Sequence, residues 1–270
     1  MGCPLFSCVM PVKGPRPYME EALASLKAQG LGDALEVIVQ DGDVGGRGMR
    51  DEDLGVRWIS EEDCGQSDAL NKGFAKARGE WLFWLNADDV LLPGALKKTK
   101  DYIGRVEHVD RVAWIAGNTV YIDDTGKVLY ARRDAVWRSW FGLRMRAWTG
   151  GPSAFFRRAL WEKRGGFDTA LRYVMDVDLW TRWAIANERF AELDDYIWGF
   201  REHGGSATTG GKNTADHLRE RTDLLIKHGI KHEAFWRNVT RMSSLLDGSW
   251  FARMYDSHLL RGKHWTGVVR

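Results

Sequence analysis

The chain has 270 residues, of which 44% are hydrophobic, and a formal net charge of +2 at pH 7, so it can bury a sizeable core and is no general binder of nucleic acids. Its three cysteines, Cys3, Cys8 and Cys64, include no C-x-x-C pair, which excludes a structural zinc site and favours a reducing cytoplasm. We find no secretory leader and no apolar run of about 20 residues, so we expect a cytoplasmic protein whose membrane contact, if any, is peripheral at the inner face.

The first half of the chain predicts alternating strands and helices. Short apolar runs rich in β-branched residues indicate strands at 6–12, 35–40, 56–60 and 81–85. Amphipathic stretches indicate helices between Pro17 and Gly30, at 67–78, and after Pro93. This order is typical of an α/β fold with a doubly wound, mostly parallel sheet, in which ligands bind beyond the carboxyl ends of the strands.

The second half predicts a hairpin and further helices. The hairpin spans 112–132 and turns at Asp124-Thr125-Gly126, helices are indicated at 159–164 and 176–187, and a last strand at 197–201. From Thr214 onward, and again at 235–246, the periodicity is helical. We expect one domain at 1–205 and a helical appendage at 206–270 that packs on it.

The strongest local signal is Asn86-Ala87-Asp88-Asp89, which follows an apolar strand. Two adjacent carboxylates repel each other, and a divalent cation with oxygen ligands removes that repulsion. Asp88 and Asp89 are therefore candidate ligands of Mg²⁺ or Mn²⁺, either of which can bridge the phosphates of a nucleotide diphosphate. An ordinary acidic turn before the next helix is the alternative.

Three more polar residues follow a strand or begin a helix. Asp41 ends the second predicted strand, where its carboxylate can accept a hydrogen bond from a base or a ribose hydroxyl. Asp68 and Asn71 lie in the first turns of a helix that follows Gly65, and a helix N-terminus with Lys72 nearby favours phosphate. Simple capping of the helix is the alternative for both.

A second acidic motif, Met175-Asp176-Val177-Asp178-Leu179-Trp180, follows the turn Gly165-Gly166-Phe167-Asp168. One carboxylate could act as general base on an acceptor hydroxyl. A spacing of two puts Asp176 and Asp178 on different sides of a helix, so we expect one to face the site and the other to support it. His203, after the last strand, could complete the coordination of a metal.

Taken in order, these motifs resemble the family-2 glycosyltransferases of the GT-A fold, in particular bacterial members that build polysaccharide or lipopolysaccharide. The resemblance covers about residues 5–206. It also rests on Glu-Glu-Asp-Cys-Gly-Gln-Ser-Asp-Ala-Leu-Asn-Lys-Gly at 61–73 and Ala-Arg-Gly-Glu at 77–80. Asn86 stands where many members have Asp, and Met175 where many have Glu.

The resemblance implies roles for the matching positions. Pro11 and Asp41 would line the nucleoside pocket, assisted by Asp68 and Asn71. Asp88 and Asp89 would hold the ribose and the metal-bound diphosphate, and His203 would contact the metal or the diphosphate. Gly150 and Gly151 would form a glycine loop near the acceptor, and Asp176 would be the catalytic base.

The expected reaction is metal-dependent transfer of a sugar, with inversion, from a nucleotide-sugar, by default a UDP-sugar, to a hydroxyl of a glycan or lipid-linked acceptor. A sugar-nucleotide nucleotidyltransferase is one alternative, although Pro11-Val12-Lys13-Gly14-Pro15-Arg16 is a poor match to its phosphate loop. A non-catalytic glycan-binding scaffold with an inactive fold is the other.

The C-terminal region is basic and aromatic. Residues 201–270 hold 12 Lys and Arg against 7 Asp and Glu, with Trp and Phe interleaved among them. The pattern fits a peripheral membrane or lipid-linked acceptor surface, and it equally fits helices that pack on the main domain.

Overall fold

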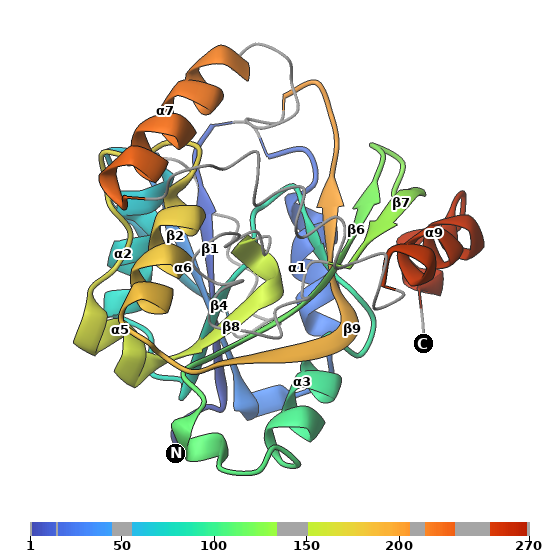
Figure 1. Ribbon diagram of the computed structural model, residues 1–270, viewed down its shortest axis with the longest axis horizontal. Coiled ribbons are helices and arrows are strands. Elements are labelled where there is room, and N and C mark those ends of the chain that lie inside the picture. The colour runs from blue at the N-terminus through green and yellow to red at the C-terminus, as the bar shows by residue number, and fades with distance from the viewer. Residues whose placement is uncertain are drawn as a thin grey trace.

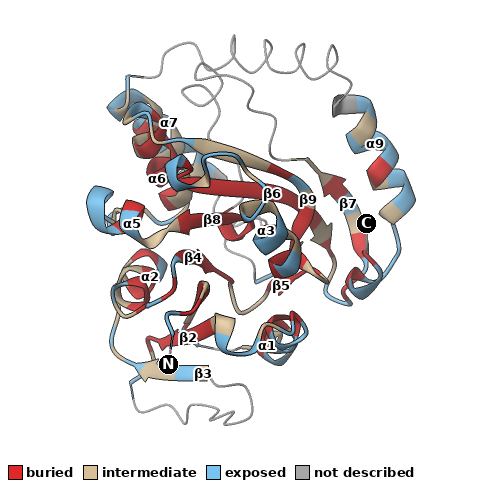
Figure 2. Ribbon diagram, turned by 90° about the horizontal axis from the view of Figure 1, so that it is seen from below, coloured by how far each residue is buried: buried red, intermediate tan, exposed pale blue. Residues whose placement is uncertain are grey.

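The structure, a computed structural model, describes residues 2–14, 16–44, 56–133, 151–205, 214–229 and 249–268. These residues form one sheet of nine strands with helices on both of its faces (Figure 1, Figure 2). The predicted α/β class with a doubly wound sheet is confirmed.

The first residues of the chain build a parallel half-sheet. Its strands are β1 (Phe6–Val12), β2 (Leu35–Asp41), β3 (Val56–Ser60) and β4 (Trp81–Trp84). They lie in the order β3-β2-β1-β4, and every neighbouring pair is parallel. The chain moves outward from β1 to β3 and then crosses to the other side of β1. In such sheets this reversal leaves a crevice at the carboxyl ends of the strands, here between β1 and β4.

The other half of the sheet mixes strand directions. The order continues with β8 (Ala154–Arg157), β6 (Trp114–Ile122), β9 (Phe190–Arg201) and β5 (Val90–Leu91), while β7 (Val128–Arg132) pairs with β6. Because β8 runs antiparallel to β4, it begins at the edge where β4 ends. β9 is longer than the expected strand at 197–201, since its partly exposed first half also pairs with β6.

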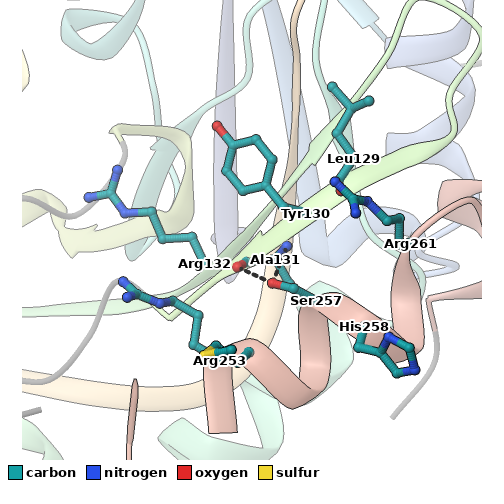
Figure 3. A pocket seen from close by; sticks show the side chains of 9 residues that line it. Leu129, Tyr130, Ala131, Arg132, Arg253, Ser257, His258 and Arg261 are labelled. Carbon is teal, nitrogen blue, oxygen red and sulfur yellow. Dashed lines mark hydrogen bonds between the residues drawn. The ribbon is translucent and has the colours of Figure 1, made fainter. Parts of the chain in front are cut away.

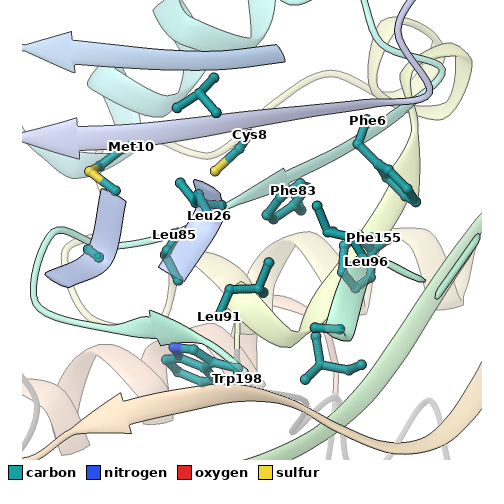
Figure 4. Packing of buried hydrophobic residues seen from close by; sticks show 14 of the residues in the cluster. Phe6, Cys8, Met10, Leu26, Phe83, Leu85, Leu91, Leu96, Phe155 and Trp198 are labelled. Carbon is teal, nitrogen blue, oxygen red and sulfur yellow. The ribbon is translucent and has the colours of Figure 1, made fainter. Parts of the chain in front are cut away.

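Helices bury both faces of the sheet. α1 (Met19–Lys27) and α3 (Ala95–Ile103) cover one face, where Leu26 and Leu96 pack with Phe83 (Figure 4). α2 (Gln66–Ala75), α5 (Arg158–Arg164) and α6 (Met175–Ile185) cover the other. There the rings of Trp114 and Trp180 stack with centroids 4.8 Å apart. Burial on both faces explains why β4 is wholly apolar.

The described C-terminal residues also pack on this body. Glu220 of α7 (Thr214–Lys227) accepts a hydrogen bond from the backbone N–H of Tyr173, at 3.0 Å. α9 (Ser249–Leu260) lies along β7, and the 3₁₀ turn Trp265–Gly267 buries Trp265 against the hairpin. The helical periodicity at 235–246 lies outside the described residues, and the boundary at residue 205 stays a prediction. None of the described helices is both long and apolar enough to cross a bilayer.

Candidate functional site

A cleft of about 340 Å³ opens where the winding of the sheet reverses. Pro11 lines it from the end of β1, Asp88 from the turn after β4, and His203 from the loop after β9. These three residues were selected from the sequence, and the fold brings them together from positions up to 192 residues apart because three strands end at the same edge. Lys13, Arg16 and Asp63 complete the charged lining.

Asp41 lies beneath the cleft rather than on its surface. Its fully buried carboxylate accepts hydrogen bonds from Arg16 Nη2 at 2.6 Å and from Trp58 Nε1 at 3.2 Å. The Arg16 guanidinium also stacks on the Trp58 ring, 5.5 Å from its centroid. Asp41 therefore acts on the cleft through Arg16, whose cationic group it orients.

Close packing beside Asp41 explains a glycine in the same turn. A Cβ on Gly42 would lie 1.9 Å from Oδ2 of Asp63, a buried carboxylate that also accepts a hydrogen bond from the Gly65 N–H at 2.9 Å. Any side chain at position 42 would therefore displace the Asp63 carboxylate, which lines the cleft.

The two adjacent aspartates have different surroundings. The Asp88 side chain is 37% exposed, and its Oδ2 lies 3.1 Å from Nε2 of His203. Asp89 is buried, and its two oxygens accept hydrogen bonds from the Arg201 backbone N–H and from Asn86 Nδ2, both at 2.9 Å. Burial, and then the neighbouring charge of Asp88, raise the pKa of Asp89 well above its usual range. Asp88 thus faces the cleft, whereas Asp89 holds the turn.

Arg201 supports this turn from behind. The fully buried guanidinium donates from Nε to the Asp88 carbonyl oxygen at 2.9 Å and forms an ion pair with Glu21. It lies 4.5 Å from the centroid of the Tyr18 ring, and the His203 ring lies 5.2 Å from the same ring. Arg201 therefore links the Asp88 backbone to Glu21 of α1. It also packs against Tyr18, the ring that contacts His203.

Asp68 and Asn71 stabilise loops beside the cleft and do not line it. Asp68 Oδ2 accepts hydrogen bonds from Lys72 Nζ at 2.9 Å and the Cys64 N–H at 3.0 Å, and these contacts, that of Lys72 foremost, lower the pKa of Asp68. The Asn71 amide donates to the Phe167 carbonyl and accepts from the Phe167 N–H, each at 2.9 Å. The sequence did not predict that Asn71 would fasten α2 to a loop 96 residues away.

Asp176 is the second residue of α6 and is half-buried. Burial raises the pKa of Asp176 to about 6, opposed by backbone N–H groups that include that of Gly151 and by the charge of Arg132. Asp178 is fully buried and pairs with Arg182 at 2.7 Å and with His228 at 2.9 Å. The two aspartates thus point to different surroundings.

Gly151 connects Asp176 to the edge of the sheet that carries the cleft. A Cβ on Gly151 would lie 2.1 Å from the ring of Trp84, the last residue of β4, so the backbone packs directly on that ring. The start of α2 makes a second connection, because Ser67 Oγ donates to Met175 Sδ at 3.0 Å. Asp176 therefore lies at the same edge as the cleft, although it does not line the cavity. Gly150 lies outside the described residues.

Asp88 and His203 are the pair through which this edge could hold a cation. Within the part of the chain that the structure describes, no three His, Cys, Asp or Glu side chains gather as a metal site would require. A cation here would take its remaining ligands from a bound substrate and water, as Mg²⁺ commonly does.

Comparison with known proteins identifies the family. The model of glycosyl transferase family 2 matches residues 7–162, more than half of the chain.

The chain belongs to glycosyl transferase family 2.

Known proteins show how far this likeness extends. An uncharacterised glycosyltransferase of Rickettsia felis is 29% identical over 189 residues, which are 66% of this chain and 31% of the relative. TarS 1-349 of S. aureus, solved in complex with UDP-GlcNAc, has a TM-score of 0.61 at 18% identity, over 86% of this chain and 69% of that one. The mannosyltransferase PcManGT from Pyrobaculum calidifontis, solved with GDP-Man and Mn²⁺, has a TM-score of 0.56 at 22% identity, over 83% of this chain and 63% of that one. The chain thus spans about a third of the Rickettsia relative, and the two structures show the shared fold alone.

Several residues of this family 2 cleft were not selected from the sequence. Arg16 and Lys13 were considered only as a poor phosphate loop, and Asp63 only as part of a motif. A signal was available for Arg201, because a charged residue that ends an apolar strand needs a buried partner. Its partner Glu21 lies 180 residues away, beyond the reach of any local pattern.

Proposed function

We propose that this chain transfers a sugar from a nucleotide-diphosphate sugar, a UDP-sugar by default, to an acceptor hydroxyl in glycan or polysaccharide synthesis, with inversion at the anomeric carbon. The observation that carries the proposal is a half-buried carboxylate of raised pKa, Asp176, at the same sheet edge as a charged cleft that contains Asp88 and His203. All three residues occupy positions that the resemblance to this family singles out.

The cleft supplies groups for the two ends of the donor. Lys13 and Arg16 provide positive charge for the diphosphate, and Asp41 keeps Arg16 in place. Pro11 and Tyr18 offer apolar surface on which a nucleoside can pack. Asp68 and Asn71 assist by holding the loops rather than by contact with the donor.

Mg²⁺ or Mn²⁺ is the proposed cofactor, and the residues of the cleft fit it. Asp88 and His203 would hold the cation together with phosphate oxygens of the donor, because they are adjacent and line the cleft. Asp89 is not proposed as a ligand, since both of its oxygens already accept hydrogen bonds from the chain. When bound, the cation would neutralise negative charge that develops on the departing diphosphate.

Asp176 performs the proton transfer in the proposed reaction. Its carboxylate takes the proton of the acceptor hydroxyl while that oxygen forms a bond to the anomeric carbon, on the side opposite the diphosphate. The bond from the anomeric carbon to the phosphate oxygen breaks at the same time, and the nucleotide diphosphate leaves. The Gly151 N–H and the Arg132 charge favour the ionised base, which is the form that this step requires.

The direct test combines binding with turnover. We expect thermal stabilisation by UDP or GDP in the presence of Mn²⁺ or Mg²⁺, and release of nucleotide diphosphate from the matching nucleotide-sugar, with EDTA abolishing both effects. Turnover unaffected by EDTA would remove the metal from the proposal. Formation of a nucleotide-sugar from a nucleoside triphosphate and a sugar phosphate would instead show that the protein is a nucleotidyltransferase. Binding of a nucleotide-sugar without turnover would show that it is a non-catalytic scaffold.

A further inference from the structure

A second cavity lies away from the cleft, between the outer strand of the hairpin and the C-terminal helix. It has a volume of about 480 Å³ and opens between β7 and α9 (Figure 3). Ser257 closes its floor, because the hydroxyl bonds both to the Ala131 N–H at 3.1 Å and to the Ala131 carbonyl at 2.9 Å. We call this cavity the β7–α9 groove.

Positive charge dominates the β7–α9 groove. Arg132, Arg253, His258 and Arg261 line it, and none of the described lining residues is acidic. Arg253 and Arg132 extend to the same side of the groove (Figure 3). Arg261 lies near Leu129 and donates a hydrogen bond to the Leu129 carbonyl oxygen at 3.3 Å. The nearby acids have other partners: Glu202 accepts from the Tyr130 hydroxyl, and Asp256 pairs with Arg133. Guanidinium groups arranged in this way suit phosphate oxygens.

The outer face of α9 is apolar and faces solvent. Met254, Tyr255 and Leu259 are 53%, 64% and 45% exposed. Tyr255 and Leu259 are four residues apart and therefore share one face of the helix, while the neighbouring Met254 also lines the β7–α9 groove. An apolar helix face beside exposed arginines is the composition of a helix that lies in the surface of an anionic bilayer.

Arg132 connects the β7–α9 groove with the transfer site. It ends β7, where it donates to the Tyr121 hydroxyl at 3.2 Å, and its charge acts on Asp176. The Arg132 guanidinium that lines the groove thus also lies within electrostatic reach of Asp176.

We propose that the β7–α9 groove binds the phosphate of an amphipathic lipid that carries the acceptor hydroxyl, while the apolar face of α9 lies against the lipid surface. This inference rests on the proposed glycosyl transfer, because it names the class of acceptor. A lipid phosphate fits better than a phosphorylated soluble glycan, since Tyr255 and Leu259 place exposed apolar side chains beside the groove, where a lipid surface would contact them.

The first experiment measures co-sedimentation of the full chain with vesicles of phosphatidylcholine alone or with added phosphatidic acid. We expect binding to the second alone, and about 30-fold weaker binding for Arg253→Gln/Arg261→Gln, the effect of two basic side chains beside an anionic leaflet. The matched control is Lys97→Gln/Lys100→Gln on α3, which removes the same charge from exposed positions and should bind like the unmodified chain. Equal losses in both double variants, equal binding to both vesicles or no binding would overturn the proposal.

A second pair of substitutions tests the apolar face. Tyr255→Ser/Leu259→Ser changes exposed side chains, so folding should be kept, and we expect vesicle binding to fall by about tenfold or more. The alternative outcome is that this variant binds vesicles normally, that inorganic phosphate alone stabilises the chain, and that Arg253→Gln/Arg261→Gln abolishes this stabilisation. In that case the ligand of the groove is a soluble phosphate, and the proposal of a lipid ligand is refuted.

Nucleotide binding separates this inference from the proposed function. The β7–α9 groove does not contribute to the donor cleft, so thermal stabilisation by UDP with Mn²⁺ should be the same in Arg253→Gln/Arg261→Gln as in the unmodified chain. Vesicle binding without nucleotide binding would refute the transferase and keep the lipid site. Nucleotide binding without vesicle binding would refute the lipid site and leave the proposed transferase intact.

Discussion

At the scale of single residues, surroundings rather than residue type separate the four aspartates of the two acidic motifs. Asp88 and Asp176 are partly exposed at the edge of the sheet, whereas Asp89 and Asp178 are buried and fully bonded by the chain. Each motif thus pairs one carboxylate that can meet a substrate with one that holds the local structure. Predictions for these residues follow from that division.

Asp176→Asn tests the base. We expect kcat to fall by at least about 100-fold with little change in donor binding, because the amide cannot accept the proton. In the unmodified chain, activity should fall as the pH drops through about 6, where Asp176 becomes protonated. Rate measurements against pH check both statements, with Asp101→Asn on α3 as control. Full activity in Asp176→Asn would refute the assignment.

The same substitution should stabilise the fold. Burial raises the pKa of Asp176 to about 6, so its ionisation opposes folding, and this penalty is full above pH 6 and disappears as the pH falls towards 4. At pH 8 we expect Asp176→Asn to have a free energy of unfolding about 1–3 kcal/mol higher than that of the unmodified chain, and therefore a higher melting temperature. This advantage should be lost near pH 4. An equal or lower melting temperature at pH 8 would contradict the argument.

Asp88 and Asp89 should respond differently to truncation. Asp88→Ala should leave the melting temperature of the free chain nearly unchanged and remove the additional stabilisation that Mn²⁺ gives with UDP. Asp89→Ala leaves the Arg201 N–H and the Asn86 amide without their acceptor, so it should lower the free energy of unfolding by about 2–4 kcal/mol. Thermal denaturation with and without ligands distinguishes the two; similar behaviour of both variants would argue against separate roles.

At the scale of elements, β9 and α1 together support the turn that carries Asp88. Arg201 ends β9 and binds the Asp88 carbonyl on one side and Glu21 of α1 on the other. The Trp265 indole also donates to Glu21, so the C-terminal 3₁₀ turn shares this support. The position of the cleft residues therefore depends on an element more than 60 residues further along the chain.

Glu21→Gln tests this support. It removes the charge that faces the buried Arg201, so we expect a loss of about 1–2 kcal/mol in the free energy of unfolding and a higher KM for the donor. Glu20→Gln, next in the chain and exposed, should change stability by less than about 0.5 kcal/mol. Denaturant titrations and donor kinetics of the two variants make the comparison; equal effects would show that the network has no special role.

At the scale of the whole molecule, two half-sheets meet at the edge that carries the cleft. The parallel half ends at the proposed donor cleft. The mixed half contributes Gly151 just before β8, Asp176 on α6 and His203 just after β9. The C-terminal residues cover the far end of the mixed half, where Trp265 and Val268 are buried with the hairpin. A chain that ends at residue 248 should therefore lose at least about 3 kcal/mol of stability, measured by thermal unfolding. Unchanged stability would show that these residues are a separable tail.

The sequence by itself determined the class of the fold and most of its elements. Mostly apolar runs that end near Pro11, Asp41 and Asn86 marked three parallel strands, because strands buried on both faces are nearly continuously apolar. Order and spacing of the acidic motifs also placed Asp88, Asp176 and His203 among the candidates.

Only the tertiary structure decided which of these side chains face the cleft. Asp41 is covered by Arg16, Asp89 accepts a hydrogen bond from Arg201, and Asn71 is bound to Phe167. Each of these partners is distant in the chain and is brought close only by the fold. Burial and hydrogen bonding of a polar group depend on contacts between distant segments, which a local pattern does not contain. The β7–α9 groove has the same origin, because its arginines come from a strand and a helix about 120 residues apart.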